Sequence, residues 1–306
     1  MHWCKHFVHY YLITQFVLSI ASINCLAQDD RSVKRIDSII KAAQGRALAM
    51  LANIDTVCPS PYWPNIKPSL FLANLRKNIL YPTKINQGKA TNFCGYAAFT
   101  HILLKYQPDT YTRIIISFYK TGKADLYRRT VKPSLRVRDA AGTLKRKGEL
   151  DVLHADQLWF LTMADTYKGY LNIFDHKYQP GDENTFWAAT NYGKFNRMLR
   201  EFGDYKVKKV GSDMIRPWKK DLFGYLAQQL DSGIVMMYIN SKLTHPTKHS
   251  FFRLPAPTHF VVLYNLYREG DLIQIQYWDY GLRTEQIITK KRLKKMTFGI
   301  STITKK

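Results

Sequence analysis

Apolar residues recur at helical spacing through the first two thirds of the chain. Positions three and four residues apart predict an amphipathic helix over 31–54 and a shorter helix over 69–78, with Ser69 as its N-cap. A further helix is predicted to begin at Cys94 and to end before Pro108, because proline cannot continue a helix. The same spacing predicts helices at 108–122, 154–169, 190–203 and 218–233.

The last third changes to the short, β-branched and aromatic runs that are typical of strands. Strands are predicted at 234–240, 258–267, 272–280 and 283–289, and a short basic helix at 290–299. The basic, glycine-containing segment 121–150 is predicted to be loop or edge strand. Because helices come first and a meander of strands follows, the predicted fold class is α+β.

One hairpin in the strand region brings two polar residues together. Residues 268–270, Arg-Glu-Gly, fit a three-residue hairpin loop with glycine in the left-handed position. This loop would place His259 directly opposite Asp279 on one face of the hairpin. A polar ring at the start of the most apolar strand needs a partner, so we predict a contact between the two. A cap by Asp279 on the turn at Tyr280 and Gly281 is the alternative.

The N-terminus has the order of regions found in secretory signal peptides. Lys5 is the only Lys or Arg before Arg31, and an apolar stretch leads to a small-residue ending at Ala27. Residues 1–27 are therefore predicted to be a cleaved signal peptide, which sends the protein to the periplasm or out of the cell. An uncleaved membrane anchor and lipidation at Cys25 are the alternatives.

A proline-rich segment separates the first helix from the rest of the chain. Four prolines fall within residues 58–68, which excludes a helix there and predicts a linker or a strap over the surface. We therefore treat residues 28–80, the first helix with this strap and the short helix after it, as an N-terminal part that precedes the main domain.

The charge of the chain is strongly basic. Its 306 residues include 46 Lys and Arg against 23 Asp and Glu, a net charge of +23. Removal of residues 1–27 takes away one lysine and no acidic residue, which leaves +22. Such a charge suits anionic surroundings such as an envelope surface, glycan or lipid headgroups. The sequence has no nucleic-acid motif and no zinc-ligand spacing, so nucleic acid is not the expected partner, and no metal or other cofactor is expected.

Few cysteines remain in the predicted mature chain. Cys4 and Cys25 leave with the signal peptide, and Cys58 and Cys94 are too few for a disulfide scaffold. Cys94 can be a packed side chain, half of a disulfide with Cys58, or a nucleophile. The start of a helix favours a thiolate, because it offers unpaired N–H groups and the positive end of the helix dipole.

A nucleophilic cysteine needs a base, and six histidines follow the predicted signal peptide. They are His101, His154, His176, His245, His249 and His259. His101 lies on the face of Cys94, but seven residues along a helix rise by about 10.5 Å, too far for a hydrogen bond, so His101 is predicted to be a packed side chain. His245 and His249 lie in a polar connection, whereas His259 begins a strand, which makes it the preferred base.

Three sequence blocks together resemble the papain-like cysteine peptidase superfamily. The blocks are "QGKATNFCGYAAFTHIL" (87–103), "THFVVLYNLY" (258–267) and "YWDYG" (277–281). They are most similar to bacterial members that resemble the bacteriocin leader peptidases. In those proteins a Gln precedes a Cys-Gly at a helix start, a His opens an apolar strand, and an Asp or Asn lies on the next strand.

The resemblance implies a papain-like catalytic domain over 81–306. In such a fold, the helix of the nucleophile packs on a C-terminal antiparallel sheet. Cys94 and His259 are 165 residues apart, more than a minimal member needs, which implies a helical insert within about 108–220.

The resemblance also implies the role of each site residue. Cys94 would be the nucleophile, His259 the general base and acid, and Asp279 the group that holds the imidazole. Gln87 would donate to the oxyanion together with the Cys94 backbone N–H. The gap of seven residues between Gln87 and Cys94 departs from the usual gap of about six. The alternatives to Gln87 are therefore Asn86 and Asn92.

The expected function is a secreted thiol hydrolase that cleaves a peptide or amide bond through a thioester. Its expected substrates are proteins, peptides or cell-wall peptides. An acyltransferase uses the same triad and is an alternative. A non-catalytic binding or toxin-type protein on the same scaffold is another, and so is a zymogen in which residues 28–80 cover the site until they are cut.

Overall fold

The structure, a computed structural model of the whole chain, describes most of the predicted mature protein. The described residues are 37–54, 58–88, 91–144, 152–167, 170, 176–243 and 256–305. The predicted signal peptide, His245 and His249 lie outside them. Within the described residues, no helix has the length and apolar character needed to cross a membrane.

Helices and strands alternate more than the sequence pattern predicts. The helices are one over residues 37–52, α2 (Pro68–Leu80), α3 (Cys94–Tyr106), α4 (Pro108–Thr121), α5 (Leu135–Ala140), α6 (His154–Tyr167), α7 (Tyr192–Phe202), α8 (Leu222–Ser232) and α9 (Lys290–Met296). Single 3-10 turns are η1 (Pro82–Lys84), η2 (Asp182–Asn184) and η3 (Ser241–Leu243). The strands are β1 (Ala124–Asp125), β2 (Thr130–Val131), β3 (Tyr205–Gly211), β4 (Ile234–Ile239), β5 (His259–Glu269), β6 (Leu272–Asp279), β7 (Leu282–Thr289) and β8 (Thr297–Lys305).

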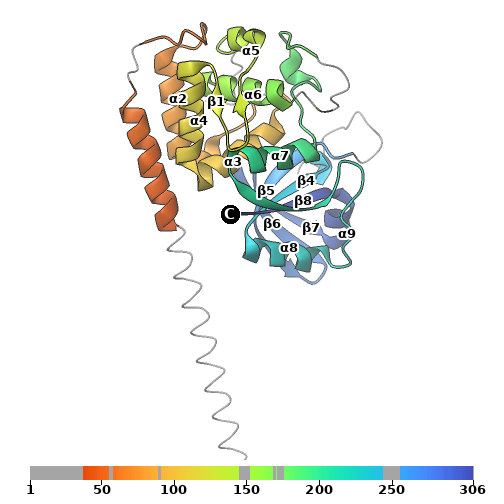
Figure 1. The fold of residues 1–306 in the computed structure, drawn as a ribbon. Helices are drawn as coiled ribbons and strands as arrows, with labels where there is room; N and C mark the ends of the chain where they lie inside the picture. Colours follow the sequence, from red (N-terminus) through yellow and green to blue (C-terminus); the bar gives the residue numbers. More distant parts are fainter. Residues whose placement is uncertain are drawn as a thin grey trace, which may run out of the picture.

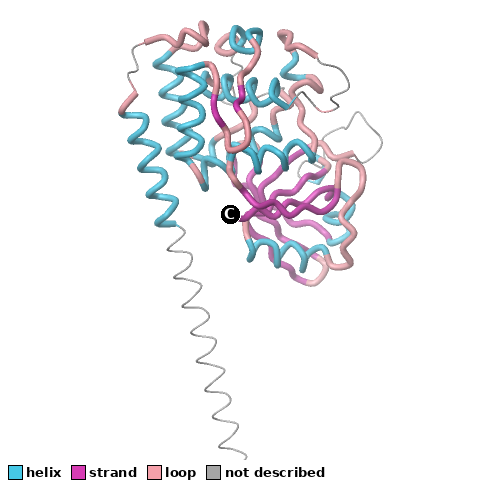
Figure 2. The backbone as a smooth tube through the Cα atoms, in the orientation of Figure 1, coloured by secondary structure: helices cyan, strands magenta, loops and turns pink. Residues whose placement is uncertain are grey.

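Six strands form one antiparallel sheet in the order β3-β8-β4-β5-β6-β7, with helices on both faces (Figure 1). One face packs in a core with α3, α6 and α7, and the other packs with α8 and α9. Figure 2 shows the strands of this sheet below the first helical layer, with α8 beneath them. The predicted α+β class is therefore confirmed, with an antiparallel sheet as its β part.

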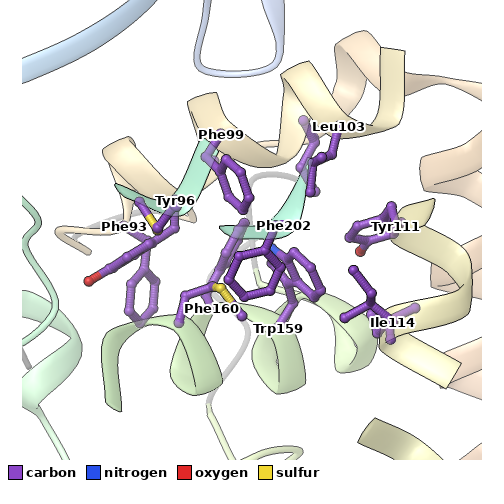
Figure 3. Packing of buried hydrophobic residues seen from close by; sticks show 14 of the residues in the cluster. Phe93, Tyr96, Phe99, Leu103, Tyr111, Ile114, Trp159, Phe160 and Phe202 are labelled. Atoms are coloured by element: carbon purple, nitrogen blue, oxygen red, sulfur yellow. The ribbon is translucent and has the colours of Figure 1, made fainter. Parts of the chain in front are cut away.

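Helix α3 lies in the interior of the helical layer. Every residue from Gly95 to Leu104 is buried, so the helix has no solvent face along most of its length. Trp159 of α6 packs against Phe99 (Figure 3). Its indole N–H donates to the Thr100 hydroxyl at 2.8 Å. Packing on all sides fixes the position of the helix, and with it the position of its first residue.

The proline-rich segment is part of this core. Trp63 is fully buried, and its indole N–H donates to the carbonyl of Phe118 in α4 at 2.6 Å. Ile66 is buried in the same cluster, and the Lys67 N–H donates to His154 at the start of α6. The segment therefore contacts α4 and α6, helices that the sequence places in the predicted insert.

Two strands were not predicted, and several helix boundaries were wrong; for example, the helix predicted over 290–299 ends at Met296, where β8 follows. β3 and β8 form one side of the sheet, yet β8 carries serine, threonine and glycine, and β3 carries three lysines on an edge strand. Neither strand has the regular apolar alternation that identifies strands in a sequence. Helix α2 begins at Pro68 with Lys67 as its N-cap, so Ser69 is not the cap.

Gly95 allows α3 to approach the sheet closely. A Cβ at this position would lie 2.2 Å from Thr190 Cγ2 and 3.1 Å from the Phe260 ring. Gly95→Ala is expected to lower the free energy of unfolding by about 1–3 kcal/mol in chemical denaturation, because the added methyl overpacks this contact. Combining it with Thr190→Ser, which removes the nearest methyl, is expected to recover part of the loss.

Gly45→Ala is the matched control for this substitution. Gly45 lies exposed in the helix over 37–52, with open space around it. Alanine there is expected to raise the free energy of unfolding by about 0.5–1 kcal/mol, since glycine destabilises a helix interior. Equal effects of the two alanine substitutions would contradict close packing at Gly95.

Candidate active site

His259 and Asp279 meet, but not in the predicted register. The β5–β6 hairpin closes through the two-residue loop 270–271, so Glu269 pairs with Leu272 instead of lying in the loop. The predicted three-residue loop is therefore wrong. By itself, the shorter loop would turn His259 and Asp279 to opposite faces of the hairpin, because side chains alternate along a strand.

A β-bulge at Tyr264 reverses that change. The register shifts by one residue between Leu263 and Asn265, which leaves Tyr264 as the extra residue of β5. Beyond the bulge, Val262 pairs with Trp278. The side chains of His259 and Asp279 therefore lie on the same face of the hairpin after all. Asp279 is the diagonal neighbour of His259 across the two strands rather than the residue directly opposite it.

The contact between the two side chains is short and buried. His259 Nε2 lies 2.5 Å from Asp279 Oδ1, and the side chains are 4% and 2% exposed. The ring of Tyr280 stacks on the imidazole with centroids 4.7 Å apart. Tyr280 has φ +46°, a left-handed conformation that is rare for a bulky residue, and it shares the β6–β7 turn with Gly281. The sequence signalled that turn but not this ring over the histidine.

The surroundings of His259 favour its protonated form. Burial lowers its pKa, but the charge and hydrogen bond of Asp279, followed by the hydrogen bond and charge of Cys94, raise the pKa to about 10. Because Nε2 faces Asp279, Nδ1 is the nitrogen left for the sulfur. The ring therefore binds its proton more tightly in the folded protein. Its contribution to stability is full below about pH 6.5 and is lost as the pH rises to about 10.

Cys94 is the first residue of α3 and is half-buried. Its Sγ lies 3.8 Å from the carbonyl oxygen of Thr258, the residue before His259. No side chain caps the helix at Phe93. The first backbone N–H groups of α3 have no intrahelical partner, as at the start of any α-helix, and they lie beside the sulfur. Cys58 is exposed, and both thiols are free, so the disulfide alternative is not formed in this structure.

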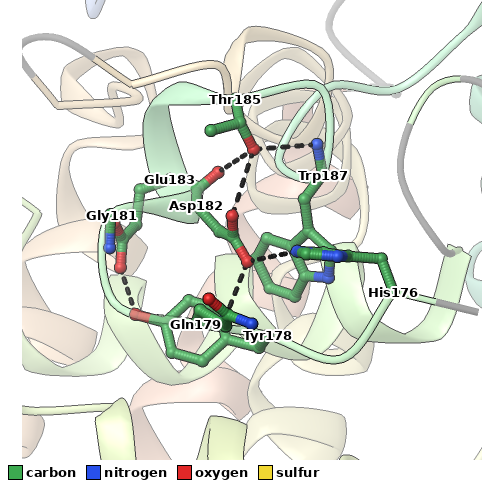
Figure 4. Close-up of polar contacts among 8 residues, drawn as sticks. All are labelled: His176, Tyr178, Gln179, Gly181, Asp182, Glu183, Thr185 and Trp187. Atoms are coloured by element: carbon green, nitrogen blue, oxygen red, sulfur yellow. Dashed lines mark hydrogen bonds and ion pairs between the residues drawn. The ribbon is translucent and has the colours of Figure 1, made fainter.

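A polar loop fixes the segment that leads into α3. The side-chain amide of Asn92 donates to the carbonyls of Asn184 and Thr185, each at 2.9 Å, and its backbone N–H donates to Glu183. Asp182 holds this loop through its contacts with His176, Gln179 and Thr185 (Figure 4). Since Asn92 already uses both amide protons, it is a poor alternative to Gln87 as an oxyanion donor.

Gln87 lies in a turn of its own. Its amide N–H donates to the carbonyl of Thr91 at 3.0 Å, and the Thr91 hydroxyl donates back to the Gln87 carbonyl. Asn86 accepts from the N–H of Gly88 at 2.8 Å. Among the described contacts of Gln87, none reaches Cys94, so its oxyanion role stays a prediction.

His101 is a packed side chain, as the helical rise predicts. It is fully buried, stacks on Trp278, and bonds to the Pro82 carbonyl and the Tyr264 hydroxyl at 3.0 and 2.7 Å. Burial lowers its pKa to about 3, with a smaller lowering by the charge of Lys105. His101 is therefore neutral, and it ties α3 to the bulge of β5 and to the turn before Gln87.

Comparisons with protein-family models, curated proteins and solved structures give no match for this chain. What the site can do is therefore inferred from its own geometry. Within the described residues, no group of three or more His, Cys, Asp or Glu side chains is placed to hold a metal ion. A sulfur, an imidazolium and a carboxylate in series can instead support nucleophilic attack on a carbonyl carbon.

Asp279→Asn is expected to lower the pKa of the His259 ring from about 10 toward its ordinary value. Burial lowers this pKa, and in the variant only the interaction with Cys94 is left to raise it. The pKa is measured from the Cε1–H resonance in an NMR titration. Cys94→Ala is expected to lower it less, since the Asp279 interactions are the larger ones.

Asp182→Asn is the matched control for this titration. It removes a carboxylate from another histidine, His176, at 2.8 Å on the surface. The pKa of His259 is expected to stay unchanged in this variant. A ring pKa that stays near 10 in Asp279→Asn would contradict the proposed control of His259 by the carboxylate.

Proposed function

We propose that the protein is a thiol hydrolase of the cysteine peptidase type, with Cys94 as its nucleophile. Two observations support this: the His259 imidazole contacts the Asp279 carboxylate through Nε2, and the Cys94 sulfur lies 3.8 Å from the carbonyl oxygen of Thr258, the residue before His259. This order of groups is the one that activates a thiolate nucleophile. Helix α3, which begins with Cys94, contacts strand β5, which begins with His259, and this contact supports a papain-like arrangement of helix and sheet.

In the first half of the reaction, Cys94 reacts as a thiolate beside the His259 imidazolium. The sulfur attacks the substrate carbonyl carbon, and the oxygen gains a negative charge. The Cys94 backbone N–H at the start of α3 donates to that oxyanion, and the Gln87 amide is the second donor that we propose. The imidazolium then gives its proton to the leaving amine as the carbon–nitrogen bond breaks, which leaves a thioester.

In the second half, neutral His259 acts as a general base on water. The water oxygen attacks the thioester carbon, and the released sulfur and the ring return to the ion pair. Asp279 keeps Nε2 oriented throughout and stabilises the positive ring, so the ring needs no reorientation between steps. Tyr280 covers one face of the imidazole and limits its contact with water.

Proteins, peptides and cell-wall peptides are the substrates that we propose. The basic charge of the chain supports work at an anionic envelope, where such peptides occur. Secretion through residues 1–27 belongs to the same proposal. The N-terminal part as a removable cover has less support, because residues 58–80 contribute Trp63 and other buried side chains to the main core.

Cys94 is expected to react with iodoacetamide faster than the more exposed Cys58 by roughly tenfold or more at about pH 6, because an ordinary thiol is almost wholly protonated there. Peptide mapping by mass spectrometry measures the two rates separately. In His259→Gln the advantage of Cys94 is expected to disappear.

His176→Gln is the control, since it removes an exposed histidine that also contacts an aspartate. It is expected to leave both alkylation rates unchanged. Alkylation of Cys94 at the same rate with and without His259 would contradict an activated thiolate.

Cys94→Ala is expected to lower kcat/KM for hydrolysis by roughly a thousandfold or more, because the step that forms the thioester is lost. The assay follows the cleavage of a peptide mixture and of cell-wall fragments by mass spectrometry. Cys58→Ala is the control and is expected to retain full activity, because Cys58 is an exposed thiol in the proline-rich segment.

An added amine distinguishes hydrolysis from acyl transfer in the same assay. Capture of the acyl group by the amine, without hydrolysis in its absence, would favour the acyltransferase alternative. If neither product forms although Cys94 is selectively alkylated, a binding protein on the same scaffold is favoured instead.

A further inference from the structure

The loop between β3 and α8 exposes three large apolar side chains. Met214, Ile215 and Trp218 are 88%, 73% and 95% exposed. Trp218 is the most exposed of the large apolar side chains in the described structure. Figure 1 shows this loop on the outer edge of the molecule, between the strand end and α8. Exposed apolar residues that gather on one segment mark an interaction site more often than isolated ones do.

The loop is held in a defined shape by its own backbone and by β8. Gly211 has φ +81°, and a Cβ there would lie 2.0 Å from the Phe298 carbonyl oxygen, so glycine allows the loop to close over β8. The Ser212 N–H donates to the carbonyls of Ile215 and Phe298. The Ser212 hydroxyl accepts from the N–H groups of Met214 and Ile215 at 3.2 and 2.8 Å. The apolar side chains therefore project from a structured turn.

Cations surround the apolar tip. Arg216 and Lys220 are exposed in the loop itself, and the half-buried Lys219 places its ammonium over the Tyr225 ring of α8 at 4.4 Å. The Arg216 guanidinium packs over the Phe298 ring at 4.7 Å, which places the charge at the base of the tip. Phe298 follows α9, a helix that adds further exposed lysines. These are Lys291, Lys294 and Lys295.

The two acidic residues of the loop have structural partners. Asp213 accepts from the backbone N–H of Tyr192 and from the hydroxyl of Tyr170, at 3.0 and 3.1 Å. Asp221 is the N-cap of α8 and accepts from Gly224. Asp213 is thus bound within the fold and the exposed Asp221 caps α8, while Arg216 and Lys220 are exposed beside the apolar tip.

We propose that residues 212–220 are a membrane-binding loop that inserts Met214, Ile215 and Trp218 into the headgroup region of an anionic lipid bilayer. Tryptophan and aliphatic side chains favour that interface, and nearby Lys and Arg are attracted to anionic headgroups. A net charge of +23 adds long-range attraction to the same surface. A bilayer accepts a projecting apolar tip without a preformed groove, which favours it over a protein partner.

The test measures binding of the full chain to vesicles by co-sedimentation. The vesicles are phosphatidylcholine alone or mixed with phosphatidylglycerol. Met214→Ser/Ile215→Ser/Trp218→Ser keeps every charge and is expected to lower the partition coefficient on the mixed vesicles by roughly tenfold or more. Arg216→Gln/Lys219→Gln/Lys220→Gln is expected to reduce the preference for mixed over phosphatidylcholine vesicles.

A matched triple variant controls for the loss of exposed apolar surface elsewhere. Leu135, Leu272 and Ile287 are 69%, 50% and 67% exposed and lie outside the loop. Leu135→Ser/Leu272→Ser/Ile287→Ser is expected to bind within about twofold of the unaltered chain. Thermal melts of all variants show that each one folds, and Cys94→Ala is expected to bind normally, since lipid binding does not depend on the proposed hydrolase.

Three results would overturn the proposal. One is the absence of binding to the mixed vesicles by the unaltered chain, and a second is equal binding by the loop variant. The third is a concentration-dependent dimer without lipid that the loop variant abolishes, which would make the loop a contact between copies of the chain.

Discussion

The buried contact between His259 and Asp279 is the interaction on which the candidate site depends. A buried carboxylate or imidazolium without a partner is strongly unfavourable, because it has little access to water. Together the two form a charge-assisted hydrogen bond, and the effect of the carboxylate opposes burial and raises the pKa of the ring. The contact exists because one strand carries an extra residue at Tyr264, which turns both side chains to the same face.

Much of the fold was predictable from apolar spacing, because periodicity reports burial on one face. Helices α4 and α7 have it, and so does strand β6. β8 does not, because its buried residues include Ser301 and Thr302, whose hydroxyls are satisfied by partners distant in the sequence. A pattern of side-chain polarity cannot reveal partners that only the fold supplies.

The contact between His259 and Asp279 was predictable in its partners but not in its register. The prediction that His259 and Asp279 share a face of the hairpin was right although the predicted loop was wrong. The shorter loop alone would put them on opposite faces, and the extra residue at Tyr264 returns them to one face. Tyr280 was missed as a site residue, because its place over the imidazole requires a left-handed tyrosine. A left-handed backbone conformation at a single residue produces no repeating pattern of apolar residues, so the sequence gives no sign of it.

The exposed loop and the candidate site have a common support. Asp213 at the base of the loop accepts from Tyr170, whose hydroxyl lies 3.5 Å from that of Tyr238. Tyr238 in turn stacks on Phe260, the residue after His259, with ring centroids 4.3 Å apart. Because Tyr238 belongs to β4, which pairs with the strand that begins at His259, the loop and the candidate site are attached to the same sheet. A bilayer that binds the loop would therefore set the orientation of the sulfur relative to the membrane surface.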